Sequence, residues 1–271
     1  SMDWSKLNIW QAATDHHKII QAFKKLYPGK WVSTGISKGG QATIFHRRFY
    51  PEDVDVSIPY VAPVNLSDED FRVYDFLDSV GTPTCRNRIY EFQRTLFKKK
   101  KEIMPLFRDY AKKHNYEFNM GIERAFELSI LEYPFAFWQW GDAPCSKIPA
   151  MDASAKELFH HFVSISPPTF FEEKDIESVR PFFYQALTEI GMYGYEVEPF
   201  KEFLDDTANI TFEHTLPEGV QVRFDSAVMQ DVHQWLRDSG NYILYIYGEN
   251  DPWYATGFTP SEKTNAVKMV R

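Results

Sequence analysis

The segment that most constrains how this chain folds is residues 35–40, with the sequence GISKGG. A β-type run precedes it and an amphipathic helical run follows it, so we expect a sharp strand-to-helix turn centred on Ser37. Side chains two positions before and after the centre of so tight a turn would collide, and Gly35 and Gly39 avoid that collision. The pattern is that of a nucleophile elbow, Gly-x-Ser-x-Gly.

An elbow of this kind predicts nucleophilic chemistry at its serine. The helix N-terminus would lie beneath Ser37. Its dipole and the backbone N–H of Lys38 would stabilise the oxyanion that forms when Ser37 attacks a carbonyl. One alternative is a glycine-rich phosphate cradle, which requires Gly-x-x-x-x-Gly-Lys-Ser/Thr, and Lys38 stands in the wrong place for it. A chance match to the bare motif is the other alternative.

The hydrophobic pattern around the elbow predicts an α/β fold. Helical spacing covers residues 12–26 and 39–49, and β-type runs cover 30–35 and 54–61. This helix-strand-helix-strand order is typical of right-handed crossover units that build a parallel sheet. We therefore expect a mostly parallel sheet of the α/β-hydrolase type.

The middle of the chain follows a helical pattern. An amphipathic stretch at 87–114, with Pro105 as the expected break, is followed by another at 122–133 and by a ring-rich run at 133–140. We predict no strand between 65 and 219, and interpret this block as a large helical lid. The expected division of the chain is a first core segment at 1–64, the lid at 65–219 and a second core segment at 220–271.

A second chemical signal follows the strongly apolar strand predicted at 242–247. Asp251 comes just after it, where an α/β-hydrolase carries the acid that orients a histidine. Glu249 is the neighbouring competitor, and an aspartate that only shapes a turn before Pro252 is the structural alternative. We expect Asp251 to be the acid, with one more strand at 265–270.

The histidine of a serine triad is the missing part of the pattern. The order in this fold is serine, acid, histidine, yet all 8 histidines precede Asp251. His46 follows the elbow and is expected to point away from Ser37, and His233 is a weak candidate. Few strands are predicted before the elbow. The pattern therefore predicts a chain truncated at both ends, with the histidine beyond Arg271.

Composition narrows the class of protein. Of the 271 residues, 44% are hydrophobic and 17% aromatic, and the net charge of −8 disfavours a nucleic-acid binder. No apolar run is long enough to span a membrane, and residues 1–20 lack the apolar block of a signal peptide. We find no metal-ligand spacing and expect no cofactor. Cys85 and Cys145 are left open as free thiols or as one disulfide.

Three segments carry a family resemblance. They are WVSTGISKGGQ at 31–41, EYPFAFWQ at 132–139 and YGENDPW at 247–253. Together they resemble the bacterial secreted tripeptidyl aminopeptidases, a group of prolyl tri/tetrapeptidyl aminopeptidase-like serine peptidases. The resemblance implies Ser37 as nucleophile, Asp251 as triad acid, peptide substrates and a secreted or periplasmic location.

The resemblance also gives the predicted lid a purpose, because an exopeptidase needs a carboxylate to hold the free amine of its substrate. Glu132 is the candidate, with Glu123 and Glu127 on nearby turns, and a packing or surface role is the alternative for each. The rings of the run at 133–140 either line a pocket suited to proline or form the core of the lid. These rings are Tyr133, Phe135, Trp138 and Trp140.

The leading hypothesis is a serine exopeptidase. It would release short, tripeptide-like and in part proline-containing units from peptide N-termini through an acyl-enzyme on Ser37. An esterase or lipase of the same fold is one alternative. A catalytically incomplete fragment that acts as a binding module is the other, and the absent histidine is its main support.

Overall fold

The computed structural model describes residues 3–141, 144–207 and 210–271. The chain forms two compact units. The sheet unit comprises Ser1–Val73, Pro181–Tyr193 and Gly219–Arg271, and the helical unit comprises Tyr74–Arg180 and Gly194–Glu218. The division into domains at 1–64, 65–219 and 220–271 stays a prediction.

The sheet unit is built on a parallel sheet of four strands in the order β1-β2-β3-β4. Its strands are β1 (Val32–Ile36), β2 (Val56–Tyr60), β3 (Leu244–Tyr247) and β4 (Val267–Val270). Each overlaps a predicted β-type run. Because all four strands are parallel, their carboxyl ends lie at one edge of the sheet, where ligands bind in open α/β sheets. The predicted α/β class is confirmed, and the sheet is consistent with an α/β-hydrolase-like fold.

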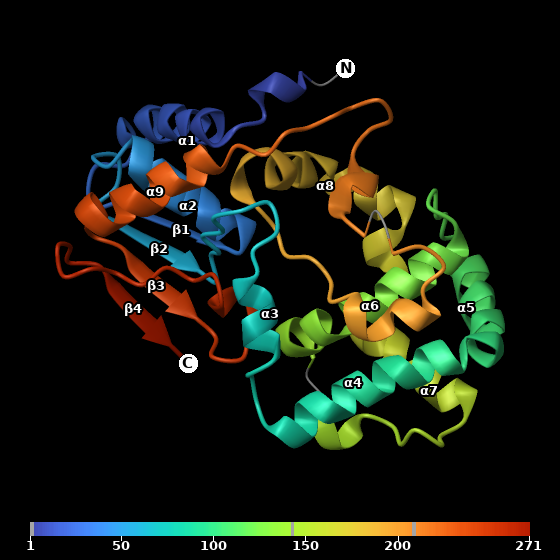
Figure 1. Ribbon diagram of the computed structural model, residues 1–271. Helices are drawn as coiled ribbons and strands as arrows, with labels where there is room; N and C mark the ends of the chain where they lie inside the picture. Colours follow the sequence, from blue (N-terminus) through green and yellow to red (C-terminus); the bar gives the residue numbers. More distant parts are fainter. Residues whose placement is uncertain (1–2, 142–143, 208–209) are drawn as a thin grey trace. The chain divides into compact units, whose positions relative to one another are not determined.

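Helices α1 (Ile9–Lys24), α2 (Lys38–Phe49) and α9 (Ser226–Ser239) accompany the sheet (Figure 1). Helix α2 contacts β1 and β2 as well as α1 and α9, and most of its residues from Gly40 to Arg47 are buried. Asn8 begins α1, because its side chain accepts a hydrogen bond from the N–H of Gln11 at 2.8 Å. Asp225 begins α9 in the same way, accepting from the N–H of Ala227 at 3.0 Å.

The helical unit is organised around one long buried helix. Its helices are α4 (Pro83–Lys98), α5 (Lys100–His114), α6 (Ile122–Trp140) and α7 (Ala155–Ile165). Helix α6 packs against α4, α5 and α7 and is buried along most of Ala125–Phe137. Two of the four boundaries between the units fall within α3 (Arg72–Leu77) and α8 (Glu173–Gln185), and the other two follow Tyr193 and Glu218.

Shorter helical segments complete the described elements. They are η1 (Trp4–Lys6), η2 (Cys145–Lys147), η3 (Pro168–Phe171), η5 (Glu198–Phe203), η6 (Phe212–Thr215), η7 (Pro252–Tyr254) and a π-helical segment, η4 (Ala186–Ile190).

Two predicted helix boundaries were wrong. The break in the stretch at 87–114 falls at Lys99, with backbone angles of −94° and 18°, and not at Pro105. Pro105 lies in the second turn of α5, where its missing N–H removes only one backbone hydrogen bond. Helix α6 continues past Tyr133 and through Pro134, so the ring-rich run is helical as well.

The block between 65 and 219 contains no strand in the ranges that the structure describes, and one isolated bridge joins Glu69 to Met192. A disulfide joins Cys85 of α4 to Cys145 of η2, with 5.5 Å between their Cα atoms. It closes a loop within the helical unit. No described helix is long and apolar enough to cross a bilayer.

Candidate active site

The elbow joins β1 directly to α2. Ser37 has φ 53° and ψ −119°, a conformation that a non-glycine residue adopts only under strain. A Cβ at Gly35 would stand 2.3 Å from the carbonyl carbon of Gly39, so position 35 accepts only glycine, as predicted. The predicted collision at Gly39 is wrong, because a Cβ there meets nothing within 4 Å. Gly40 is the other constrained position, where a Cβ would lie 2.8 Å from the oxygen of Tyr60.

The strained turn leaves the Ser37 hydroxyl uncommitted. Ser37 occupies the N-cap position of α2, but its side chain makes no capping hydrogen bond. Its backbone N–H instead donates to the oxygen of Tyr60 at 2.9 Å, which ties the elbow to the end of β2. Lys38 is the first residue of α2, so its N–H is among those with no partner within the helix. A hydroxyl above free N–H groups can attack a carbonyl and have the resulting oxyanion stabilised.

The side chain of Lys38 has a different environment from its backbone. Its Nζ lies 5.7 Å from the ring centroid of Phe45. Burial lowers the pKa of the ammonium group to about 8, against a smaller opposing effect of the Glu189 carboxylate. Burial of the Glu189 carboxyl group raises its own pKa, and this group accepts a hydrogen bond from the N–H of Ile9 at 2.8 Å. Lys38 therefore contributes its backbone to the elbow, while its side chain packs on α2.

Asp251 lies in the loop that follows β3, at the same sheet edge as the elbow. Its carboxylate accepts a hydrogen bond from the N–H of Trp253 at 2.9 Å and so begins η7. Burial raises the pKa of Asp251, and the hydrogen bond from Trp253 opposes that shift. A half-buried carboxylate at a carboxyl edge is able to orient an imidazole and to stabilise its charged form. Glu249, the neighbouring competitor, is exposed.

Hydrogen bonds connect the segments at the ends of β2 and β3. The hydroxyl of Tyr247 donates to the oxygen of Ala62 at 2.8 Å and accepts from the N–H of Phe258 at 3.0 Å. The N–H of Val64 donates to the oxygen of Thr256 at 2.8 Å. These bonds fix the acid loop relative to the end of β2, which also holds the elbow.

Val61 is a strained residue that the sequence did not reveal. It has φ 41°, which is an outlier for a β-branched side chain. Its N–H donates to the oxygen of Ile246 at 2.8 Å, so the strained residue links β2 to β3. No sequence signal marks it, because valine is an ordinary residue at a strand end.

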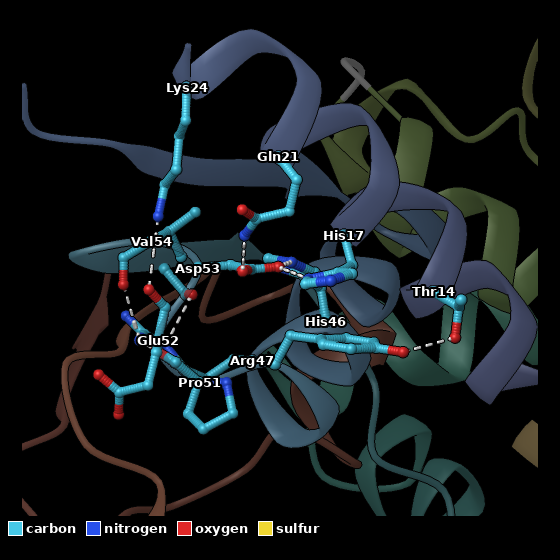
Figure 2. A network of polar contacts seen from close by, with 12 residues as sticks. Thr14, His17, Gln21, Lys24, His46, Arg47, Pro51, Glu52, Asp53 and Val54 are labelled. Carbon is cyan, nitrogen blue, oxygen red and sulfur yellow. Dashed lines mark hydrogen bonds and ion pairs between the residues drawn. The ribbon is translucent and has the colours of Figure 1, made fainter. Parts of the chain in front are cut away.

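Two histidines belong to a polar network between α1 and α2 (Figure 2). His17 Nδ1 and His46 Nε2 lie 2.7 Å and 3.0 Å from Asp53 Oδ2, and Gln21 donates to Asp53 Oδ1 at 2.8 Å. His46 is fully buried, and burial lowers its pKa despite the hydrogen bond to Asp53. A neutral His46 that donates from Nε2 leaves Nδ1 without a partner among the described residues. His46 therefore serves this network, in agreement with its expected orientation away from Ser37.

The weak candidate, His233, packs its ring against Phe258 with 5.5 Å between centroids. Burial lowers its pKa, and the charges of Arg237 and Arg72 act in the same direction. Within the described ranges, no histidine hydrogen-bonds Ser37 or Asp251, and no cluster of histidine, cysteine and acidic residues is arranged to hold a metal ion.

Comparison with known proteins places this geometry in a family. Residues 1–266 match the family described as PS-10 peptidase S37. The chain belongs to this family. A prolyl tri/tetrapeptidyl aminopeptidase of Streptomyces mobaraensis is 34% identical over 260 residues, which cover 94% of this chain and 54% of that protein. The chain thus spans about half the length of this curated relative. The predicted membership of the tripeptidyl aminopeptidase family is confirmed.

The helical unit of this S37 family member holds the predicted amine-binding residue. Glu132 lies on α6 with 7% of its surface exposed, and it accepts a hydrogen bond from the hydroxyl of Tyr195 at 2.8 Å. Glu127 is buried and paired with Lys100 at 2.7 Å. Glu123 is exposed and paired with Arg108.

The rings at 133–140 separate into two groups. Tyr133 is fully buried, with its hydroxyl 2.8 Å from Nε2 of His161, and therefore belongs to the core. Trp140 is 70% exposed at the end of α6. Phe135 and Trp138 line a cavity of about 540 Å³ inside the helical unit. Residues distant in sequence, including Asp78 and Glu196, complete its lining. No motif marks these two acids, and the nearby aromatic residues are the only sequence signal.

Proposed function

We propose that this chain carries the nucleophile and the acid of a serine exopeptidase that releases short units from peptide N-termini. The relative from Streptomyces is named for prolyl tri- and tetrapeptides, and we extend that substrate class, including its proline preference, to this chain. The observation that carries the proposal is the strained backbone of Ser37, at φ 53°, on the same sheet edge as Asp251.

The reaction would proceed through an acyl-enzyme. Ser37 Oγ attacks the scissile carbonyl while its proton passes to a histidine base, and the backbone N–H of Lys38 stabilises the oxyanion. Collapse of this intermediate breaks the C–N bond, and the histidine returns the proton to the leaving amine. Water then hydrolyses the ester on Ser37 and frees the N-terminal unit. Asp251 orients the histidine and stabilises its charged form. We propose that this histidine follows β4 in the sequence, as the family resemblance implies.

Glu132 keeps a proposed part in recognition of the free amine. Its buried carboxylate accepts a hydrogen bond from Tyr195, and Tyr195 lines the cavity of the helical unit. Glu132 itself is not part of that lining, so we assign it the role of fixing the Tyr195 ring.

We also propose that the protein is secreted or periplasmic. The disulfide between Cys85 and Cys145 supports this proposal, because disulfides persist in oxidising compartments and are rare in the cytosol.

The function is tested with peptide amides and esters that carry a chromogenic leaving group, in the full-length protein. Ser37→Ala should lower the hydrolysis rate by about 10⁴-fold or more, because the acyl-enzyme no longer forms. Ser164→Ala is the matched control, since this serine is exposed on α7 and, among the described residues, its hydroxyl bonds only the oxygen of His161. An unchanged rate in Ser37→Ala would refute the proposal. Cleavage of esters without cleavage of peptide amides would instead favour the esterase alternative.

A further inference from the structure

The helical unit contains a half-open cavity that helices and one loop line. Its volume of about 540 Å³ lies in the range of small-ligand pockets. The end of α3, helices α4 and α6, and the segment at 194–200 surround it. The residues that matter for its chemistry are the rings Tyr74, Tyr90, Phe135, Trp138, Tyr195 and Phe200 and the acids Asp78 and Glu196.

The rings of the aromatic wall are held by contacts with one another and with residues outside the cavity. The ring of Trp138 lies against Gly81, where an added Cβ would stand 2.3 Å from Cη2 of the indole. Tyr90 and Phe200 pack with 5.5 Å between ring centroids. Tyr195 is anchored through its hydroxyl to the buried carboxylate of Glu132. A preorganised wall of ring faces attracts organic cations and also packs well against a proline ring.

Two acids that are exposed to solvent, Asp78 and Glu196, give the cavity lining a negative charge. Glu196 and Asp78 are close enough to interact, since the pKa of Glu196 is raised by partial desolvation of its carboxyl group and then by the negative charge of Asp78. Among the described residues, no lysine, arginine or histidine forms an ion pair with either acid. Two acids that repel each other without a counter-ion favour the arrival of a cation.

Among the described residues, Arg86 is the one cationic side chain in the lining, and its guanidinium already has partners. Arg86 donates from Nη1 to the backbone oxygens of Ser79, Val80 and Gly81, at 3.0, 2.9 and 3.1 Å. These bonds direct its guanidinium to the end of α3, so the structure does not pair it with Asp78 or Glu196. The cavity therefore combines packed rings with two neighbouring acids, and no cationic side chain of the described residues is paired with them.

We propose that this cavity is the subsite for the free ammonium group of a peptide, with Glu196 and Asp78 as its ion-pair partners. The rings then take up the first side chains of the peptide. The inference rests on the proposed exopeptidase function and assigns direct contact to Glu196 and Asp78. Glu132 acts behind them as a positioning residue for Tyr195.

Binding should depend on pH in a defined direction. The raised pKa of Glu196 means that its charge is lost at a higher pH than for an ordinary glutamate. As the pH falls through that value, the affinity for a free-amine peptide should fall, while the affinity for an N-acetylated peptide should not. On the alkaline side, affinity falls as the peptide amine, with an ordinary pKa of about 8, loses its proton.

The test uses the full-length Ser37→Ala protein, which binds peptide without turning it over. Calorimetry compares Ala-Ala-Pro amide with its N-acetyl form. Acetylation should weaken binding roughly ten- to thirtyfold, as expected for loss of hydrogen bonds to a charged group. When Glu196→Gln is added to this protein, binding of the free-amine peptide should weaken by a similar factor. Acetylation should then change the affinity by only about threefold or less. Asp78→Asn should act in the same direction.

Glu198→Gln is the matched control, because Glu198 is exposed on η5, pairs with Lys201 and does not line the cavity. It should leave the full acetylation effect in place. The inference is overturned if acetylation has no effect, or if its effect persists unchanged in Glu196→Gln and Asp78→Asn. Its failure is separable from that of the proposed function. Hydrolysis that depends on Ser37 would leave the peptidase standing without this subsite, and amine-dependent binding without hydrolysis would leave the subsite standing alone.

Discussion

The sheet unit and the helical unit organise their polar groups in different ways. In the sheet unit, the proposed catalytic residues lie at strand ends: Ser37 follows β1 and Asp251 follows β3. Bonds to the backbone oxygens of Tyr60 and Ala62 hold the two loops, and the bond to Ala62 comes from the Tyr247 hydroxyl. In the helical unit, the acids and rings come from several helices and a loop, and side-chain contacts such as Tyr195 to Glu132 hold them. The proposed catalytic site therefore depends mainly on bonds to the backbone, and the proposed subsite depends on side-chain packing.

This difference predicts how each unit responds to substitution. A backbone-defined site should tolerate changes of charge without unfolding, but no added Cβ at its tightest turn. A packing-defined site should depend on the covalent and aromatic contacts that keep its helices in place. Substitutions chosen in each unit test the contrast.

The largest expected effect is that of Asp251→Asn on catalysis. Without the carboxylate, the histidine loses its orientation and the stabilisation of its charged form, so the hydrolysis rate should fall by about 10⁴-fold. Stability should not fall, because burial raises the pKa of Asp251 and its charge is unfavourable in the folded state at pH values above that pKa. Rate measurements and thermal unfolding at pH 7 check both parts. A loss of stability without a loss of rate would make Asp251 a structural residue.

Gly35→Ala should disrupt the elbow itself. The new Cβ would meet the carbonyl carbon and oxygen of Gly39 at 2.3 Å, and neither atom can move without breaking the start of α2. We expect a loss of at least about 3 kcal/mol in the free energy of unfolding, together with loss of hydrolysis. Gly39→Ala is the control, with open space around its Cβ, and should cost less than about 1 kcal/mol. Equal effects of the two substitutions would contradict the geometry of the turn.

In the helical unit, removal of the disulfide should lower stability. The Cys85–Cys145 bond closes a loop across 60 residues of sequence. Its replacement in a Cys85→Ala, Cys145→Ala double variant should lower the free energy of unfolding by about 2–4 kcal/mol. Denaturant unfolding followed by tryptophan fluorescence checks this, since the helical unit contains Trp138 and Trp140. An unchanged midpoint would mean that packing alone holds the unit.

The smallest effect concerns acid sensitivity of the sheet unit. Burial lowers the pKa of His46 in the folded protein. Near pH 6.5, the unfolded chain therefore binds a proton at His46 more readily than the folded chain does. Stability should therefore fall as the pH falls below about 6.5, by up to about 1 kcal/mol between pH 7 and 5.5. His46→Gln should reduce this difference. Asp53 adds a loss at lower pH, because hydrogen bonds from His17, His46 and Gln21 lower its pKa against the opposing effect of burial.

The same contrast explains what the sequence could reveal. The elbow, the acid loop and the parallel strands were predictable, because local glycines and short apolar runs encode them. The sequence predicted that His46 points away from Ser37, but not that Asp53 would bind it. Val61, Glu196 and Asp78 were not predictable, because their strain and their proximity arise from contacts between segments distant in sequence. Helix α6 extends beyond the predicted stretch at 122–133, because packing against α4, α5 and α7 keeps the helix intact through Pro134.

The most direct test of the central claim is to react the full-length protein with a fluorophosphonate and to map the modified residue by mass spectrometry. If the strained turn presents its hydroxyl for attack, a single phosphonyl group should appear on Ser37, and Asp251→Asn should slow its formation. Modification elsewhere, or none at Ser37 while peptide hydrolysis continues, would contradict the account.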